Sequence, residues 1–206
     1  MVSSEEGGVI SKGDQTRERI LREAAVIFNQ RGYEGCSLKE IMAATGLEKG
    51  GIYRHFANKE ELAAEAFDFA WRSTSARRRA GLSEIENHAD RLRRYVANFL
   101  ETPGFPGGCP LLNTAVDSDN GNPILRQRVR AALAEWQAMI ISILDAGIRA
   151  GTIRAAIDTR AAANRIIGSL EGAMLLSRIE GRGNPLQAAL RELDNFIETE
   201  LRARVI

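Results

Sequence analysis

Cysteine and histidine are scarce in this chain. Among its 206 residues there are two of each, and the cysteines, Cys36 and Cys109, lie too far apart for a disulfide framework. Zinc sites need clusters of Cys and His, which the sequence lacks. We therefore expect free thiols in a reducing, cytoplasmic compartment, with no metal ion and no cofactor.

Long apolar runs and a leader segment are also missing. No stretch of about 18 consecutive apolar residues occurs, so no contact with a membrane is expected. Residues 1–13 have no apolar segment of the signal-peptide kind, and we expect them to form a flexible N-terminal arm. Hydrophobic residues still make up 44% of the chain, enough for a core, and the net charge of +1 indicates nothing about nucleic acid.

The apolar residues follow a helical pattern throughout. No segment alternates apolar and polar residues as a strand does, so the sequence predicts an all-α fold. Glycine, proline and capping residues delimit the expected helices, at 16–31, 37–46, 48–56, 58–79, 83–101, 110–117, 123–150, 158–181 and 184–202. All five prolines lie beyond residue 102, so the composition changes between the N-terminal and C-terminal parts.

Segment 37–59 carries the most distinctive pattern. Ser37 followed by Glu40 matches the helix capping box, and Gly46 suits a tight turn between two short helices. The angle between these helices would be fixed by a small apolar core of Leu38, Ile41, Met42, Leu47 and Ile52. This arrangement predicts a helix-turn-helix.

The second of these helices has a composition that packing alone does not explain. Gly50 and Gly51 each weaken a helix by about 1 kcal/mol relative to alanine, and Tyr53, Arg54 and His55 follow side by side. Surface glycines allow DNA to approach closely, and the polar cluster can contact phosphates and the groove. We therefore expect this helix to lie against DNA.

The sequence around this segment resembles the TetR family of bacterial repressors. The matching motifs lie between residues 14 and 74 and are Gly-Tyr, Ser-Leu-x-x-Ile, Thr-Gly-Leu, Lys-Gly-Gly-Ile-Tyr-Arg-His-Phe and Asn-Lys-Glu-Glu-Leu. The resemblance implies a three-helix helix-turn-helix domain at 14–74, with its motif at 37–56, and a helical ligand-binding and dimerisation domain at 75–206, with about nine helices in all. It also implies a non-enzymatic homodimer that represses transcription from palindromic double-stranded operator DNA and is released by a small apolar inducer.

The resemblance further implies which residues contact DNA. They are Ser37, Lys39, Lys49, Gly50, Gly51, Tyr53, Arg54, His55 and Lys59. Packing is the alternative for Tyr53, a structural role is the alternative for His55, and Phe56 is expected to pack. Residues 14–74 hold nine Lys and Arg against ten Asp and Glu, a net charge of −1. Because one copy would neutralise few phosphates, we expect two copies to be needed.

Two kinds of signal are compatible with the C-terminal domain. The first is a small apolar or amphipathic molecule in a pocket lined by Trp71, Phe99, Phe105, Cys109, Leu111, Trp136, Met139, Ile140 and Met174, although such residues also pack helical cores. The second is an electrophile or oxidant, sensed by Cys109 as in some similar proteins. Pro110 would place this cysteine at a helix N-terminus, which lowers a thiol pKa. The alternative is that Cys109 is a small buried hydrophobic residue, as we expect for Cys36.

The last two helices are candidates for a dimer interface. The residues concerned are Ile166, Leu170, Gly172, Ala173, Leu186, Leu190, Leu193, Phe196 and Ile197, unless they form the core of a single protomer. The helix from Asn58 through Trp71 would carry a change from the core to the DNA. Rival functions are a thiol-dependent enzyme using Cys109 and His88 and a non-specific architectural DNA binder. Neither has support, because no carboxylate orienter or phosphate loop occurs and the charge is near neutral.

Overall fold

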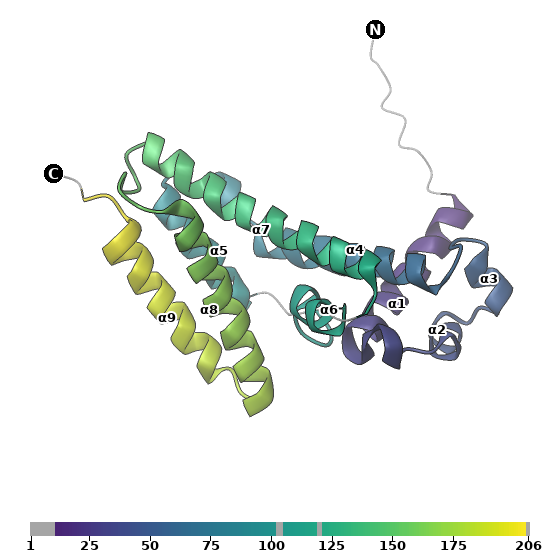
Figure 1. The fold of residues 1–206 in the computed structure, drawn as a ribbon. Coiled ribbons are helices and arrows are strands. Elements are labelled where there is room, and N and C mark those ends of the chain that lie inside the picture. Colours follow the sequence, from purple (N-terminus) through teal and green to yellow (C-terminus); the bar gives the residue numbers. More distant parts are fainter. Residues whose placement is uncertain (1–10, 102–104, 119–120, 205–206) are drawn as a thin grey trace, which may run out of the picture.

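The computed structural model describes residues 11–101, 105–118 and 121–204, and within these ranges the fold is all-α, as predicted. Helices α1–α3 gather at one end, α8 and α9 lie at the other, and α4 and α7 run between them (Figure 1). The bounds are α1 (Lys12–Gly35), α2 (Leu38–Thr45), α3 (Lys49–Tyr53), α4 (Lys59–Arg78), α5 (His88–Glu101), α6 (Pro110–Ser118), α7 (Pro123–Arg149), α8 (Thr159–Glu180) and α9 (Asn184–Phe196). A 3₁₀ helix precedes α5 (Leu82–Glu84), and a π helix follows α9 (Ile197–Leu201).

Several predicted boundaries need correction. Lys12 and Gly13, which were expected in the flexible arm, form the first turn of α1, because the Ser11 hydroxyl accepts a hydrogen bond from the Asp14 amide and caps the helix. The helix expected from Ser83 begins only at His88. The rest of the arm (1–10), part of the predicted break (102–104) and part of a predicted loop (119–120) lie outside the described residues.

Side-chain caps explain where α4, α7 and α8 begin. The Asn58 side chain accepts from the Glu61 amide at the start of α4, and the Asp158 side chain accepts from the Ala161 amide at the start of α8. Each supplies an oxygen to an otherwise unpaired helix N–H. Asn122 does the same for α7, where Pro123 occupies the first turn.

Helix α4 contributes to two apolar cores. The N-terminal core contains Ile20, Leu21, Ala24, Ala25, Cys36, Ile41, Ile52, Phe56, Leu62, Ala66, Ala70 and Phe105. The C-terminal core takes Ala63, Phe67 and Trp71 from the same helix. The boundary expected at residue 74 therefore falls inside a continuous helix, and a shift of α4 would disturb both cores.

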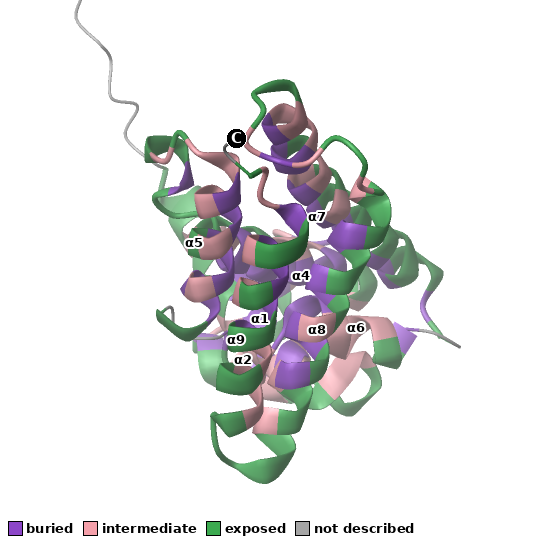
Figure 2. Ribbon diagram, turned by 90° about the vertical axis from the view of Figure 1, so that its left-hand side faces the viewer, coloured by how far each residue is buried: buried purple, intermediate pink, exposed green. Residues whose placement is uncertain are grey.

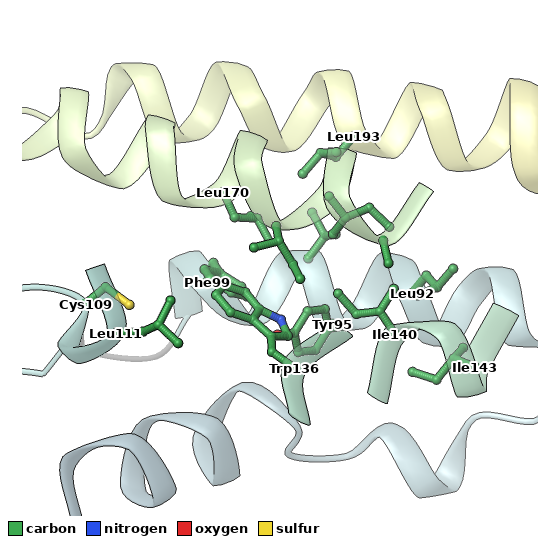
Figure 3. Close-up of a cluster of buried hydrophobic side chains, with 14 of the residues drawn as sticks. Leu92, Tyr95, Phe99, Cys109, Leu111, Trp136, Ile140, Ile143, Leu170 and Leu193 are labelled. Carbon is green, nitrogen blue, oxygen red and sulfur yellow. The ribbon is translucent and has the colours of Figure 1, made fainter. Parts of the chain in front are cut away.

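Helix α7 runs through the C-terminal core. Trp136 and Ile140 pack there beside Phe99 of α5, while Leu170 of α8 lies over them (Figure 3). By length and composition alone α7 could cross a membrane, and 33% of its most apolar window is buried within the described structure. A core helix of a globular protein passes the same test, and buried residues do gather where the helices meet (Figure 2).

Candidate DNA-binding surface and ligand cavity

The geometry around α2 and α3 is that of a helix-turn-helix. The Ser37 hydroxyl accepts from the Glu40 amide at 3.3 Å, and the Ser37 amide donates to Glu40 Oε2 at 2.9 Å, which completes the capping box. Gly46 ends α2 with φ 66° and ψ 21°, a left-handed conformation that glycine adopts without strain. The predicted small core forms, with Ile41 and Ile52 fully buried and Leu38, Met42 and Leu47 partly buried beside them.

Helix α3 presents a polar surface on the side away from this core. Lys49, Gly50 and Arg54 are exposed, and Tyr53 and His55 are half-buried. The Lys49 ammonium lies 5.8 Å from the centroid of the Tyr53 ring, a cation–π contact that holds the two side chains together. A Cβ added at Gly50 would meet no atom within 4 Å, so packing within the protein does not require glycine there.

The other predicted DNA contacts are accessible but partly engaged. Ser37 and Lys39 are exposed, and Gly51 is half-buried against Leu47. The Lys59 ammonium donates to the Tyr33 carbonyl at 2.6 Å and lies 4.3 Å from the centroid of the Tyr33 ring. Lys59 thus holds the end of α1 against the start of α4. A phosphate contact would have to share its ammonium group with that carbonyl.

Phe56 and Cys36, which the sequence indicated as packing residues, do pack in the N-terminal core. Phe56 is buried with 2% of its surface exposed, and the Arg17 guanidinium lies 4.9 Å from its ring centroid. Cys36 is buried in the same core, and burial raises the pKa of its thiol to about 11. Both residues therefore stabilise the helix-turn-helix by packing in the core with Ile41 and Ile52.

Two asparagines fasten α1 to the segment before α6. Asn29 of α1 donates through Nδ2 to the carbonyls of Pro106 (2.8 Å) and Gly108 (3.0 Å). Asn113 of α6 donates through Nδ2 to the Asn29 carbonyl (3.0 Å), the Asn29 side-chain oxygen (3.1 Å) and the Gly107 carbonyl (2.8 Å). A Cβ at Gly107 would come within 2.9 Å of the Asn29 carbonyl oxygen, so the two backbones meet closely. We call this contact the asparagine clasp.

A further contact between α6 and α1 lies at the kink of α1. Asp117 accepts a 2.7 Å hydrogen bond from the Tyr33 amide next to Gly32, whose φ of 75° breaks the helix. A side chain at Gly32 would place its Cβ 2.6 Å from the Asp117 carboxylate. Just before α6, Phe105 inserts into the N-terminal core. Helix α6 and the segment before it are therefore joined to the DNA-binding end at several points.

A cavity of about 630 Å³ borders the clasp, whose Gly107, Gly108 and Asn113 form part of its lining. Its lining includes the apolar side chains of Phe99, Phe105, Cys109, Leu112, Met174, Leu175 and Leu186, with Gln30, Asn113 and Ser177 among its polar members. Two arginines, Arg78 and Arg178, also line it, and no aspartate or glutamate of the described residues does. The volume is typical of pockets for small organic molecules.

Arg78 is the deeply buried charge of this cavity. Only 6% of its surface is exposed, and its guanidinium stacks 4.2 Å from the ring centroid of Phe99 and 5.2 Å from that of Trp136. Its nearest carboxylate, Glu171, is 3.9 Å away, and Nη1 has no hydrogen-bond partner within the described structure. Burial of a cation carries a large desolvation penalty unless an anionic, hydrogen-bonding partner compensates the charge.

Cys109 lies beside this pair, and the expectation of a lowered thiol pKa is wrong. Its sulfur donates to Glu171 Oε1 at 2.9 Å, with 7% of the residue exposed. Burial and the neighbouring Glu171 carboxylate raise the pKa of the Cys109 thiol to about 12. Desolvation therefore outweighs the helix N-terminus, and the thiol is neutral. Burial also raises the pKa of Glu171.

The predicted pocket residues divide into two groups. Phe99, Phe105, Cys109 and Met174 line the cavity. The other five are absent from the lining of this cavity and pack in or against the C-terminal core: Trp71, Leu111, Trp136, Met139 and Ile140. Their packing matches the alternative that such residues fill a helical core, and their role as lining residues stays a prediction.

No described contact joins the proposed enzyme pair. His88 Nδ1 lies 3.1 Å from the Thr152 hydroxyl, at the C-terminal end of α7, and burial lowers its pKa. Cys109 instead contacts Glu171. Among the described residues no group of three or more His, Cys, Asp or Glu could hold a metal ion.

The residues expected at a dimer interface are mostly buried within the protomer. Side chains of α8 and α9 that face the C-terminal core are Ile166, Leu170, Leu190, Leu193, Phe196 and Ile197, while Ala173 is buried and Leu186 packs against that core. They belong to the intramolecular core, the alternative that the sequence left open. Gly172 is exposed, on a face of α8 that also shows Gly168, Leu175, Leu176 and Ile179.

Comparison with known proteins identifies the fold and its two parts. Residues 20–66 match the family model described as bacterial regulatory proteins, tetR family. Residues 82–193, more than half of the chain, match the model described as tetracyclin repressor-like, C-terminal domain. The chain belongs to the TetR family.

Individual relatives agree with this assignment. A TetR transcriptional regulator from Chloroflexus aurantiacus is 44% identical, with a TM-score of 0.89 over 94% of this chain and 99% of that one. A TetR-family regulator from Cytophaga hutchinsonii is 30% identical, with a TM-score of 0.89 over 96% and 100% of the two chains. The transcriptional repressor DhaR of a Mycobacterium species is 26% identical over 84% of this chain and 88% of its own length. This TetR-family protein is a ligand-responsive, DNA-binding transcriptional regulator.

Three groups of residues in this regulator escaped sequence reasoning. Arg78 lies in a run of three arginines, Arg77–Arg79, in which no local pattern marks one of them as buried. Glu171 gave no signal. Asn29, on the apolar side of α1, was a polar residue in a buried position, and that anomaly could have flagged the clasp.

Proposed function

We propose that this regulator is a repressor that binds a palindromic operator as a homodimer and releases it when a small molecule enters the cavity beside Arg78. The observation that carries the DNA-binding part is the polar surface of α3. Lys49, Gly50 and Arg54 are exposed there, and Ile52 anchors the opposite side of the helix in the core. Such a regulator acts where bacterial DNA lies, in the cytoplasm.

The nine predicted DNA contacts would divide between bases and phosphates. Lys49, Gly50, Gly51 and Arg54 would face base edges and the groove, while Tyr53 and His55 would contact the groove wall and phosphates. Phosphates would be bound next to the start of α2 by Ser37 and Lys39, and next to the start of α4 by Lys59. The first turns of both helices carry free amides that favour anions.

Gly50 provides the test of this surface. Gly50→Ala removes a helix-weakening residue where there is open space, so the free energy of unfolding should rise by up to about 1 kcal/mol. The added methyl group would stand between α3 and DNA. Binding to a duplex selected from a random pool, measured by fluorescence anisotropy at fixed salt, should weaken about tenfold. Gly183→Ala, in an open site between α8 and α9, is the matched control. Wild-type affinity in Gly50→Ala would contradict the proposal.

An exposed apolar stripe on α8 supports the homodimer. Leu176 and Ile179 are 52% and 72% exposed, and Gly168 and Gly172 on the same face leave room for another helix to approach. Leu176→Glu with Ile179→Glu should convert a dimer to monomers in size-exclusion chromatography with light scattering. Val116→Glu, at an apolar residue of α6 that is 74% exposed, is the control and should remain dimeric. A dimeric mass for the double variant would show that this stripe of α8 is not the dimer interface.

Release of DNA would use two connections from the cavity. The first is α4, which contains Arg78 at the cavity and supplies Leu62 to the core of the DNA-binding end. The second is Phe105, which lines the cavity and also packs in that N-terminal core. A molecule that displaces Phe105 or the end of α4 would change the spacing between the two α3 helices of a dimer.

A further inference from the structure

Arg78 is a buried cation without a complete partner. The Phe99 and Trp136 rings lie close to its guanidinium, and its Nη2 donates to Met174 Sδ at 3.6 Å, so Nη1 is the donor that it can still offer. Nη1 is buried and makes no hydrogen bond in the described structure, although Arg78 lines a cavity of about 630 Å³. A guanidinium with an unpartnered N–H group can donate it to a carboxylate in a charge-assisted hydrogen bond.

Glu171 does not meet this need. Its Oε1 accepts the Cys109 thiol hydrogen bond and lies 3.9 Å from Arg78 Nη1, beyond hydrogen-bond distance. Burial raises the pKa of Glu171, which weakens its anionic form as a counter-ion. The charge of Arg78 is therefore only partly compensated from within the protein.

The rest of the cavity fits an anion with an apolar body. Arg178 lines it as a second cation, and the lining holds no acidic residue among those described. The remaining wall is largely apolar, with Phe105, Leu112 and Met174 among its members. A cationic ligand would meet two arginines and would find the nearest aromatic faces already occupied by Arg78.

We propose that the ligand of this regulator is an amphipathic organic monoanion, a carboxylate whose head pairs with Arg78 and whose apolar body fills the cavity toward Phe105. The assignment rests on the proposed function in one respect, namely that this cavity is the inducer site. The head would supply the partner that Nη1 lacks. The body would press on Phe105, which joins the cavity to the core of the DNA-binding end.

Three probes with the same eight-carbon chain test the charge requirement. Octanoate, octanol and octylammonium are titrated into the full-length wild-type protein by isothermal titration calorimetry. Octanoate should bind about tenfold or more tightly than either of the others, the usual gain from a hydrogen-bonded charge. Equal affinity for the three probes, or tighter binding of octylammonium, overturns the inference.

Variants locate the effect. Arg78→Gln should weaken octanoate binding about tenfold or more and leave octanol binding unchanged. Arg77→Gln is the matched control, because it removes a cation from the same turn of α4 outside the cavity lining. If Arg78→Gln does not fold, Arg178→Gln at the exposed rim replaces it and should weaken octanoate selectively. Octanoate affinity that is unchanged in whichever of these variants folds overturns the inference.

A separate DNA measurement distinguishes the two proposals. Anisotropy of a labelled selected duplex reports DNA release, while calorimetry reports binding without DNA. Selective octanoate binding with the duplex still held supports the cavity assignment and refutes its inducer role. If the protein dimerises and binds DNA but does not prefer octanoate over octanol and octylammonium, the carboxylate assignment is refuted and the proposed function stands.

Discussion

The asparagine clasp makes a quantitative prediction about how the two ends of the protein are joined. Asn113→Ala deletes the Nδ2 group that reaches three oxygens, at 2.8 Å (Gly107), 3.0 Å and 3.1 Å (both Asn29). Two N–H groups can make two full hydrogen bonds, each worth about 1 kcal/mol net. The oxygens left behind belong partly to buried Asn29 and add a desolvation cost. We expect a loss of about 2–3 kcal/mol in the free energy of unfolding.

Asn113→Asp sharpens this prediction. It keeps the size of the side chain but turns an oxygen toward the same three acceptors, so the loss at neutral pH should exceed that of the alanine variant. Lowering the pH protonates the carboxyl and should return part of the stability. Asn195→Ala, at an exposed position on α9, should change stability by less than about 0.5 kcal/mol.

Urea unfolding at fixed protomer concentration and hydrogen exchange provide the assays. Exchange should speed up in peptides covering the second half of α1 and residues 105–113, and stay unchanged in peptides covering α9. Wild-type unfolding midpoints for both Asn113 variants, or unchanged exchange in α1, would refute the clasp as a mechanical connection.

Three further predictions concern local chemistry. Ser37→Ala should lower the free energy of unfolding by about 1 kcal/mol, because it removes the cap of α2. Ser37→Asp retains a cap but places a negative charge at the predicted phosphate contact, so it should weaken DNA binding without lowering stability. Equal DNA affinity of the two variants would contradict the phosphate contact at Ser37. Cys109 should react with iodoacetamide far more slowly in the native protein than in urea, and equal rates would contradict its burial. Because folding raises the pKa of Cys109 from 9.0 to about 12, the stability from keeping this thiol neutral is fully present below about pH 9 and is lost as the pH rises toward 12. The slope above pH 9 should be smaller in Cys109→Ala, by up to about 1.4 kcal/mol per pH unit, in urea titrations across that range.

Sequence reasoning succeeded where the decisive contacts are local. The capping box joins Ser37 to a residue three positions away, Gly46 turns the chain by its own backbone freedom, and Ile52 follows the pattern of its own helix. Interactions of this range are encoded in a short window of residues. The capping box, the turn and the burial of Phe56 were therefore predicted, although α3 ends at Tyr53 rather than at residue 56.

The sequence left two alternatives open where an apolar helix face could pack within the protomer or against a second copy. The heptad-like stripe of α9, with Leu190 and Leu193, packs inside the protomer, whereas the exposed stripe with Leu176 and Ile179 lies on α8. A pattern of apolar residues indicates that a helix face is covered, but it does not indicate whether another helix of the same protomer or a second copy covers it. The choice depends on which helices come together, and hence on contacts between residues far apart in the chain.

The sequence by itself determined the all-α fold, the turn between α2 and α3 and the polar surface of α3, because each depends on neighbours within a few residues. Only the tertiary structure decided that Arg78 is a buried cation stacked on Phe99, and that Asn29 and Asn113, 84 positions apart, join the cavity to the DNA-binding end. Cys109 illustrates the same division. Its place at a helix N-terminus suggested a reactive thiolate, and burial beside Glu171, which no local pattern encodes, raised its pKa instead.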